Sequence, residues 1–574
     1  MSSHNASKFK TLDTESPTEP SLSGFVRDEF QLDLIKYPPD TSLFSGVDMH
    51  SLVRTKVVPW RRFGERLIYA AADRINFVPP AGHPVADANV SAIGCLPESF
   101  DAYFQTKFHK ELLTAARNLP SEEYSCRNFG VSWRKPFSLI ALAFLPATMV
   151  AFPAIWLNLL LVCVFLANLS TNLLRAFALM AWRRDNELPY WLPEGAARIS
   201  AHRRTLDVSI LVPLFREEKV LTKLVKALEA LEYPHEKLEV LFLLEEADTM
   251  TAGALAEMRL PDFIKCLTVP KDWLQTKPKA MNYALPFCKG EIVGIYDAED
   301  RPDADQLLKV VDHFLAAPAN VACVQGYLDF YNSRSNWLAR CFTIEYATWF
   351  RVILKGIQNI GLPIPLGGTT VFFRRSILEE VGGWDAHNVT EDADLGIRIA
   401  RLGYRCEMVN TTTWEEANNV PLAWIRQRSR WLKGFAMTWI SHMRDPSRLL
   451  KDLGPAGFVS FHVVLLGGIS AFLAAPLFWL LWLAHFSIPV IPMDMIPVGL
   501  WWVFLLALTG GQFVTLSAMF LATSQQHLRH LMPYILTLPL YWPLGAFAAY
   551  KAIVELFFAP FYWDKTHHGL DDEP

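Results

Sequence analysis

Long runs without charged side chains divide this chain of 574 residues into membrane and soluble parts. From Pro136 to Trp182 there are 47 residues and one charge, Arg175. A single helix of that length would measure about 70 Å, whereas the hydrocarbon core of a bilayer is about 30 Å thick. We therefore expect two transmembrane helices within 136–182, with Pro153 near the turn between them. Basic residues flank the pair on both sides, which predicts that both flanks are cytoplasmic.

Two further uncharged runs, of 31 and 27 residues, lie within 456–522 and predict two more transmembrane helices. The loop between them lacks Lys and Arg, as an external loop should. The next stretch, 527–560, is apolar but carries three charged residues and several prolines, so it could also cross the membrane. We favour an interfacial or re-entrant helix there, because the tail that follows is expected to act in the cytoplasm.

The remaining segments have soluble compositions. Residues 1–24 are rich in Ser, Thr and Pro and predict a disordered tail without a cleavable signal peptide. Residues 25–127 mix apolar and charged side chains and predict a small N-terminal α/β domain. Within 185–445, strand patterns alternate with helical patterns, which favours a mostly parallel sheet covered by helices on both faces. Residues 561–574 form the expected cytoplasmic tail.

Charge and cysteine content exclude several classes of protein. Lys and Arg total 54 against 58 Asp and Glu, a formal net charge of −4, so no nucleic-acid partner is expected. Hydrophobic residues make up 51% of the chain, which is too apolar for an ordinary soluble enzyme and implies a lipid bilayer as partner. The eight cysteines form no CxxC pair, so we expect scattered, reduced thiols rather than a zinc site or a disulfide scaffold.

Acidic side chains follow two of the predicted strands. Asp297 and Glu299 come directly after an apolar strand, and Glu245 and Glu246 end an earlier one. Most Asp-x-Glu triplets are solvated surface, but the carboxyl ends of strands are where open α/β sheets bind ligands. Carboxylates at i and i+2 can hold a hard divalent cation, Mg²⁺ or Mn²⁺, whose coordination a nucleotide diphosphate would complete.

Two later motifs carry further chemistry. Thr390-Glu391-Asp392 offers a carboxylate that could act as general base on a sugar hydroxyl, although a helix cap is the commoner role for such residues. Gln427-Arg428-Ser429-Arg430-Trp431 offers two planar cations for a pyrophosphate and an indole for a sugar ring. A basic juxtamembrane helix anchored by Trp is the alternative explanation for this second motif.

In this order, the motifs resemble those of processive, membrane-embedded glycosyltransferases of family 2, namely cellulose, chitin and hyaluronan synthases. The resemblance covers about 185–445 and, more loosely, the flanking spans. It implies an α/β GT-A domain, Rossmann-like and nucleotide-sugar-binding, inserted between transmembrane helices. It also implies an inverting enzyme of the bacterial inner (plasma) membrane, with a cytoplasmic catalytic domain. Such an enzyme would polymerise a β-linked polysaccharide from a UDP-sugar and feed the growing chain across the membrane.

The resemblance assigns a role to each motif. The residues are Asp392 as catalytic base with Thr390 and Glu391; Asp297 and Glu299 as ligands of Mg²⁺ or Mn²⁺; Pro213, Glu217, Glu245, Glu246, Lys279, Asp297, Gln427, Arg428 and Arg430 around the nucleotide sugar; Trp431 against the acceptor; and Trp563, Lys565 and Thr566 in a gating loop. The sequence departs from the family pattern in three places. Glu299 replaces Asp, a Glu pair replaces the usual Asp after the second strand, and the segment beginning at Lys279 is one residue short.

Two other functions stay open. A non-processive transferase would move one sugar onto a polyprenyl phosphate or a glycolipid, and shares the fold and the metal chemistry. A channel with an inactive domain is disfavoured, because the predicted spans contain almost no buried charge. Four or five spans are few for a single-chain pore, which predicts a homo-oligomer or a membrane partner. The 25–127 domain faintly resembles one that binds cyclic di-GMP in some relatives, but it lacks a paired Arg/Gly-rich signature.

Overall fold

The computed structural model describes residues 31–45, 49–75, 77–79, 90–129, 148–187, 205–486, 488 and 497–562. The chain divides into two compact units. One comprises Met1–Arg117 with Asn282–Cys288, and the other Asn118–Met281 with Lys289–Pro574. The predicted disordered tail, most of the first expected span before residue 148, and the gating residues Trp563, Lys565 and Thr566 lie outside the described residues.

The smaller unit combines a three-stranded sheet with short helices. Its elements are β1 (Val57–Phe63), β2 (Arg66–Ala71), β3 (Val90–Gly94), α1 (Met49–Thr55), α2 (Pro97–Lys107) and α3 (His109–Asn118). β1 and β2 form an antiparallel hairpin, and β3 pairs with β2 in parallel. The hairpin turns at Gly64, whose φ of 59° costs glycine little. This unit ends at Arg117, ten residues before the predicted boundary.

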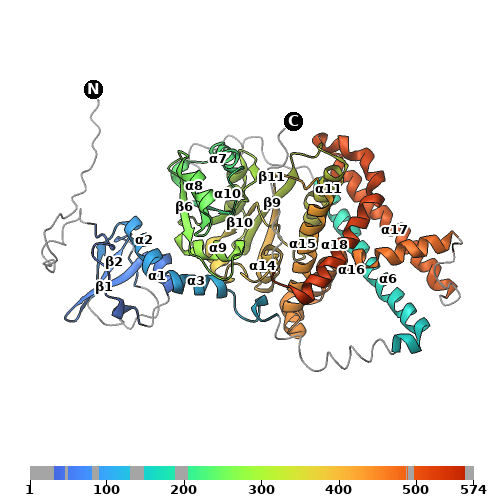
Figure 1. Ribbon diagram of the computed structural model, residues 1–574, viewed down its shortest axis with the longest axis horizontal. Coiled ribbons are helices and arrows are strands. Elements are labelled where there is room, and N and C mark those ends of the chain that lie inside the picture. Colours follow the sequence, from blue (N-terminus) through green and yellow to red (C-terminus); the bar gives the residue numbers. More distant parts are fainter. Residues whose placement is uncertain are drawn as a thin grey trace. The chain divides into compact units, whose positions relative to one another are not determined.

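Eight strands form the sheet of the larger unit, in the spatial order β6-β5-β4-β7-β10-β9-β11-β8 (Figure 1). The strands are β4 (Val208–Leu214), β5 (Leu238–Glu245), β6 (Ile264–Val269), β7 (Ile292–Ile295), β8 (Arg301–Pro302), β9 (Val321–Phe330), β10 (Val371–Arg374) and β11 (Arg405–Glu415). The first four in the spatial order run parallel, as expected, but β10 is antiparallel to both of its neighbours. The sheet is therefore mixed.

The register of the parallel strands brings the predicted acidic residues to one edge. Leu211 of β4 pairs with Ile295 of β7, and Leu214 pairs with Leu244 of β5. Because parallel strands end on the same side of a sheet, the residues that follow them meet there. The sequence predicts this edge correctly, since β4 and β5 are buried along nearly their whole length and read as continuous apolar runs.

Helices cover this sheet and lead from it to the apolar segments. They are α7 (Leu221–Glu229), α8 (Thr249–Ala256), α9 (Lys277–Ala284), α10 (Gln306–Ala316), α11 (Trp337–Ala347), the π-helix η7 (Thr348–Leu354), α12 (Lys355–Asn359), α13 (Arg375–Glu380), α14 (Glu391–Arg401) and α15 (Pro421–His442). α15 packs tightly on the start of α14. A Cβ on Gly434 would lie 2.3 Å from Thr390 Oγ1, so this approach requires glycine.

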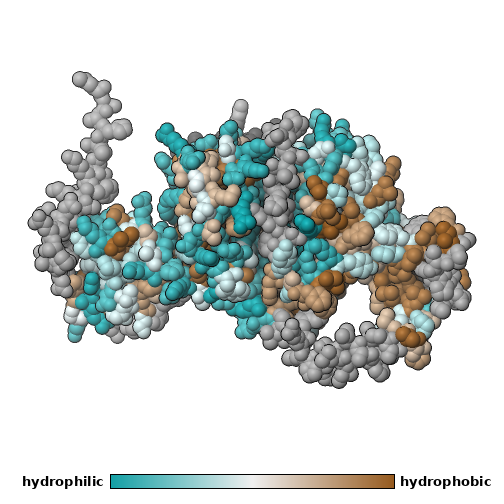
Figure 2. All heavy atoms as spheres, in the orientation of Figure 1, coloured by the Kyte–Doolittle hydropathy of each residue, from teal (hydrophilic) through white to brown (hydrophobic). Residues whose placement is uncertain are grey.

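Four segments of the described chain are long and apolar enough to cross a membrane, by length and composition. They lie in α6 (Pro153–Glu187), α16 (Pro446–His485), α17 (Val498–Thr523), and the 3₁₀ helix η9 (Gln526–Thr537) continued by α18 (Leu538–Phe558). Hydrophobic side chains gather over the region of α6 and α17 (Figure 2). α6 begins at Pro153, where the sequence predicted the turn. The segment expected to be interfacial, 527–560, thus overlaps the fourth of these candidates, Gln526–Phe558.

Candidate active site

A cavity of about 1100 Å³ joins the carboxyl edge of the sheet to the space between the apolar helices. It lies entirely within the larger unit. The predicted residues that line it are Pro213, Glu217, Glu245, Asp297, Glu299, Thr390, Glu391, Asp392, Gln427, Arg428, Arg430 and Trp431. The structure therefore brings together residues that are as many as 218 positions apart in the sequence.

Four carboxyl groups crowd the sheet edge. Burial, together with the charges of Asp297 and Glu299, holds the pKa of Asp300 well above its usual range. Burial and the charges of Asp300, Glu299 and Asp297 raise the pKa of Glu415. Asp300 accepts a hydrogen bond at 2.8 Å from the backbone N–H of Asp297, but its buried Oδ1 has no partner in the described part of the chain. With four carboxyl groups close together, this edge favours the binding of protons or of a cation.

The donor set of this edge fits a hard divalent cation. Carboxylate oxygens are the ligands that Mg²⁺ and Mn²⁺ prefer, and the buried Oδ1 of Asp300 has no hydrogen-bond partner in the described part of the chain. Within the described residues, no three His, Cys, Asp or Glu side chains are grouped closely enough to hold a metal by themselves. Asp297 and Glu299 would therefore supply two ligands and leave the remaining positions to a diphosphate.

Lys277 is the cation at this edge, although the sequence assigned that role to Lys279. Its Nζ contacts Asp297 Oδ1 and donates to the carbonyl oxygen of Gly368 at 2.6 Å. Burial alone would lower the pKa of Lys277, but the carboxylates of Asp297, Glu391 and Asp392 outweigh it and raise the pKa. Lys277 thus links the predicted metal ligands to the predicted base.

Two predicted site residues, Lys279 and Glu246, are not among the residues that line the cavity. Lys279 is fully buried, and its Nζ lies 2.7 Å from Glu245 Oε1. Each position along a helix rotates a side chain by about 100°, so Lys277 and Lys279, two positions apart, point to nearly opposite sides of α9. Glu246 accepts a hydrogen bond from the backbone N–H of Lys271 at 2.8 Å on the exposed surface.

Asp392 stands at the first turn of α14 and faces the cavity. Its Oδ1 accepts a hydrogen bond from the backbone N–H of Ala393 at 2.7 Å. A Cβ on Gly368 would lie 3.1 Å from its Oδ2 and 3.8 Å from Lys277 Nζ, so the glycine leaves Oδ2 accessible. Burial raises the pKa of Asp392, while Lys277 and Arg430 lower it. Burial and the charge of Asp392 raise the pKa of Glu391 to about 8.

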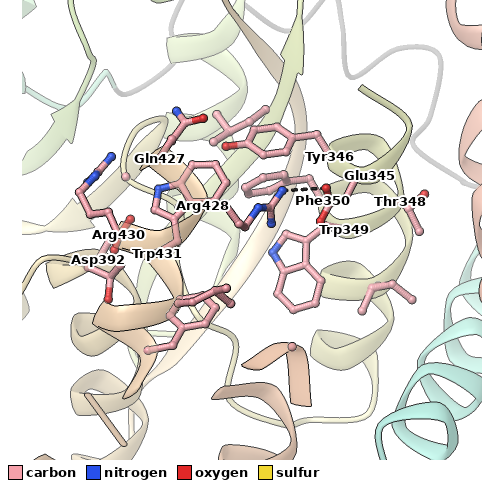
Figure 3. Close-up of a pocket in the computed structure, with 18 of the residues that line it drawn as sticks. Glu345, Tyr346, Thr348, Trp349, Phe350, Asp392, Gln427, Arg428, Arg430 and Trp431 are labelled. Carbon is pink, nitrogen blue, oxygen red and sulfur yellow. Dashed lines mark hydrogen bonds and ion pairs between the residues drawn. The ribbon is translucent and has the colours of Figure 1, made fainter. Parts of the chain in front are cut away.

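The two arginines of α15 have different surroundings (Figure 3). Arg430 lies on the same side of the view as Asp392, and its Nη1 donates to the carbonyl oxygen of Val389 at 3.5 Å. Arg428 points the other way, and its Nη2 lies 2.7 Å from Glu345 Oε2. Its guanidinium also lies 4.9 Å from the ring centroids of both Trp424 and Trp431. Arg428 is therefore paired with Glu345, whereas the charge of Arg430 acts on Glu391 and Asp392.

Trp431 forms an aromatic surface with Tyr346 of α11. Their ring centroids are 5.9 Å apart with an interplanar angle of 29°, and both rings line the cavity. Gln427 lies one turn earlier on α15 and accepts a hydrogen bond from Asn418 Nδ2 at 3.0 Å. The exposed face of a stacked aromatic pair suits the C–H face of a sugar ring.

The C-terminal end of α18 contacts α15 next to the Gln427–Trp431 motif. Lys433 is buried, and its Nζ lies 3.0 Å from Glu555 Oε2 and donates to the carbonyl oxygen of Tyr562 at 2.8 Å. Phe561 contacts His387, with ring centroids 6.2 Å apart. The chain therefore enters the predicted gating segment directly beside α15.

Sequence reasoning missed several residues that line the cavity. Glu345 accepts hydrogen bonds from Arg428 and from Tyr541, whose Oη lies 2.6 Å from Glu345 Oε2. Glu415, Gly368 and Trp349 also line it. Glu415 ends β11, so the rule that placed Glu245 at a strand end would have found it. The other three follow no local pattern.

Comparisons with known proteins agree with this geometry. Residues 292–548 match a family model described as "Glycosyl transferase family group 2". The beta-monoglucosyldiacylglycerol synthase of Nostoc sp. (strain PCC 7120) is 32% identical over 231 residues, which are 40% of this chain and 48% of that protein. The poly-beta-1,6-N-acetyl-D-glucosamine synthase of Staphylococcus epidermidis is 23% identical over 236 residues, 41% of this chain and 56% of that protein. The chain spans about half the length of the curated relatives it matches.

Among solved structures, a mannosyltransferase of Pyrobaculum calidifontis in complex with GDP-Man and Mn²⁺ covers 69% of this chain and 99% of its own, at 20% identity and a TM-score of 0.41. The family model and the relatives support a family 2 glycosyltransferase. The predicted fold class, a GT-A domain with apolar helices compatible with transmembrane segments, is confirmed.

Proposed function

We propose that this chain is an inverting glycosyltransferase that polymerises a β-linked polysaccharide from a UDP-sugar at the cytoplasmic face of a bacterial inner membrane. The observation that carries the proposal is the continuous cavity. At one end it holds Asp297, Glu299 and Asp392, and at the other it is walled by α6, α16 and α17. A donor at the sheet edge and an acceptor that extends toward the membrane would both fit this arrangement.

The donor would lie at the carboxyl ends of β4, β5 and β7. Pro213, Glu217 and Glu245 surround the position expected for the nucleoside. Asp297 and Glu299 would hold Mg²⁺ or Mn²⁺, which when bound neutralises charge that develops on the leaving diphosphate. Arg430, beside Asp392 in the cavity, would contribute a permanent positive charge from the opposite wall.

Asp392 is the proposed general base. Its Oδ2 would take the proton from the acceptor hydroxyl as that oxygen attacks the anomeric carbon, and the bond from that carbon to the diphosphate oxygen would break. Attack from the side opposite the leaving group inverts the configuration, so an α-linked donor gives a β-linked product. Lys277 and Arg430 both favour the ionised form of Asp392 that this step needs.

The acceptor would stack on Trp431 and Tyr346. Repeated addition requires the product to move by one sugar and stay bound, and a flat aromatic surface holds a sugar ring without fixing its register. The cavity continues from this surface toward α16 and α17. A homo-oligomer or a membrane partner would extend that path, because the described chain offers four candidate spans.

A second function, transfer of a single sugar to a lipid, is favoured by one specific observation. The helix side of the cavity is walled mostly by apolar side chains, among them Phe472, Phe478 and Leu508, which would suit acyl chains. The Nostoc relative, named as a beta-monoglucosyldiacylglycerol synthase, is consistent with this alternative.

Product size separates the two functions. The full chain, purified in detergent, would be incubated with UDP- and GDP-sugars, with Mg²⁺ or Mn²⁺ and with or without diacylglycerol. Release of UDP together with a long, glycosidase-sensitive polymer supports the polymerase. A product of one sugar on the lipid supports the alternative. Turnover that survives complete chelation of divalent cations would contradict the assignment of Asp297 and Glu299.

A further inference from the structure

Arg175 is a charged residue in the middle of an apolar helix. It lies on α6, two and a half turns before Arg184, or about 14 Å along the helix axis. The candidate span ends at Arg184, so Arg175 lies within the part of α6 that is expected to cross the membrane. An arginine at that depth is costly and is normally retained for a function.

The structure turns Arg175 into the cavity and not toward lipid. It lines the cavity together with Asn168, Thr171 and Asn172. These four positions are spaced i, i+3, i+4 and i+7, so they form one polar face on α6. On α17, Thr515 and Gln512 line the same cavity, and Arg175 Nη1 donates to Thr515 Oγ1 at 3.2 Å.

Glycines on the neighbouring helices bring this polar face into close packing. A Cβ on Gly511 of α17 would lie 2.1 Å from Asn172 Nδ2, and one on Gly467 of α16 would lie 2.7 Å from Thr171 Oγ1. Three helices thus converge around polar groups, although the apolar surfaces of the same helices could have packed instead. These polar side chains therefore form one closely packed site at the contact of three helices.

The charges around Arg175 are only partly paired. Arg175, Glu345 and Arg428 are among the charged residues that line the cavity. Glu345 acts on Arg175 electrostatically, but its Oε2 is already bound by Arg428 and by Tyr541. In the described chain, Arg175 forms no ion pair, because Glu345 pairs with Arg428, so the charge of Arg175 is left without a contacting carboxylate in a low-dielectric region.

We infer that this end of the cavity binds the phosphate group of an anionic lipid, held by Arg175 with Thr515, Asn172 and Gln512. A guanidinium matches phosphate oxygens with two parallel hydrogen bonds, and the hydroxyl and amide groups supply further donors. The apolar wall that includes Phe472 and Phe478 would contact the hydrocarbon chain of the same molecule. The inference does not depend on which acceptor the enzyme elongates.

The test measures bound lipid on the purified full chain by native mass spectrometry. Phosphatidylglycerol is titrated onto delipidated wild type, Arg175→Gln, Arg175→Lys and Arg184→Gln, which carries the same change at the exposed end of the same helix. Loss of a charge-assisted pair should weaken binding about tenfold or more in Arg175→Gln. Arg175→Lys should lose less, and Arg184→Gln should bind like wild type.

Three results would overturn the inference. The first is equal lipid occupancy in wild type and Arg175→Gln. The second is binding of uncharged diacylglycerol that equals the binding of phosphatidylglycerol. The third is displacement of the lipid by millimolar inorganic phosphate, which would show that free phosphate and not a lipid is recognised. Thermal unfolding of each variant verifies its fold, and Arg175→Lys keeps the test valid if Arg175→Gln does not fold. Release of UDP is measured in the same samples, so loss of the lipid site is distinguished from loss of the transferase.

Discussion

Arg428 Nη2 lies 2.7 Å from Glu345 Oε2, and this ion pair faces away from the carboxylates at the sheet edge. It joins α15 to α11, on which Glu345 lies, and the same Glu345 oxygen accepts a hydrogen bond from Tyr541 of α18. The two arginines of one motif therefore have separate tasks: Arg428 fixes the helix, and Arg430 faces Asp392.

Substitution by lysine separates these tasks. Arg430→Lys should raise the KM for the nucleotide sugar about tenfold, because a lysine cannot present two parallel donors to a diphosphate. Arg428→Lys should leave that KM within about threefold but lower the unfolding temperature, because a lysine stacks poorly between Trp424 and Trp431. Steady-state kinetics and thermal unfolding of both variants measure the difference, and equal KM changes would refute this division.

Asp392→Asn should lower kcat about 100-fold or more, since loss of a general base typically costs that much. The Kd of UDP, measured by calorimetry, should change little because the amide keeps the size of the carboxylate. A variant with wild-type turnover would remove Asp392 from the mechanism.

Gly368→Ala tests the access to that base. The new Cβ would lie 3.1 Å from Asp392 Oδ2, which displaces one or both groups, and kcat should fall about tenfold without unfolding the protein. Gly253→Ala is the matched control, because nothing lies within 4 Å of its Cβ and it sits in the helix α8. The control should keep full activity and gain up to about 1 kcal/mol of stability.

Glu391 should make the folded state less stable as pH rises. Its pKa is raised to about 8 in the folded chain from a usual value of 4.5, so the folded state binds the proton more tightly than the unfolded state. The resulting stabilisation is complete below pH 4.5 and is lost as pH rises to about 8. Glu391→Gln should remove this contribution, so its unfolding temperature relative to wild type should increase between pH 5 and pH 9. A difference that does not vary with pH would contradict the raised pKa.

Trp431→Ala should shorten the product more than it slows the first transfer. The indole and Tyr346 form the surface proposed to hold the growing chain between additions. Without it, the polymer should dissociate early, and the size distribution on a gel should shift to short oligomers. Trp431→Phe keeps a flat ring and should restore most of the length. Unchanged product length in Trp431→Ala would place the acceptor elsewhere.

The parts of the site that depend on chain direction could be predicted from the sequence. β5 and β7 are continuous apolar runs, and parallel pairing with β4 carries Glu245 and Asp297 to one edge without further information. Apolar length likewise located the C-terminal end of α17 to within one residue of 522, whereas α16 begins at Pro446, ten residues before the predicted start at 456.

Other parts depend on packing between distant segments. Whether Lys277 or Lys279 faces the cavity depends on the rotation of α9, which a short lysine-rich stretch does not determine. Glu345 gains its role from Tyr541, 196 residues later, and no local pattern marks such a pair. The end of the smaller unit is equally non-local: Ser125 and Cys126 hydrogen-bond to Asp385, which places them in the larger unit.

The size of the cavity has a thermodynamic consequence. A volume of about 1100 Å³ has room for on the order of 40 water molecules at liquid density. A ligand that fills its apolar end releases much of this water, so binding should show a negative change in heat capacity that grows with the length of the ligand. Calorimetry at several temperatures would then report how far along the cavity each ligand reaches.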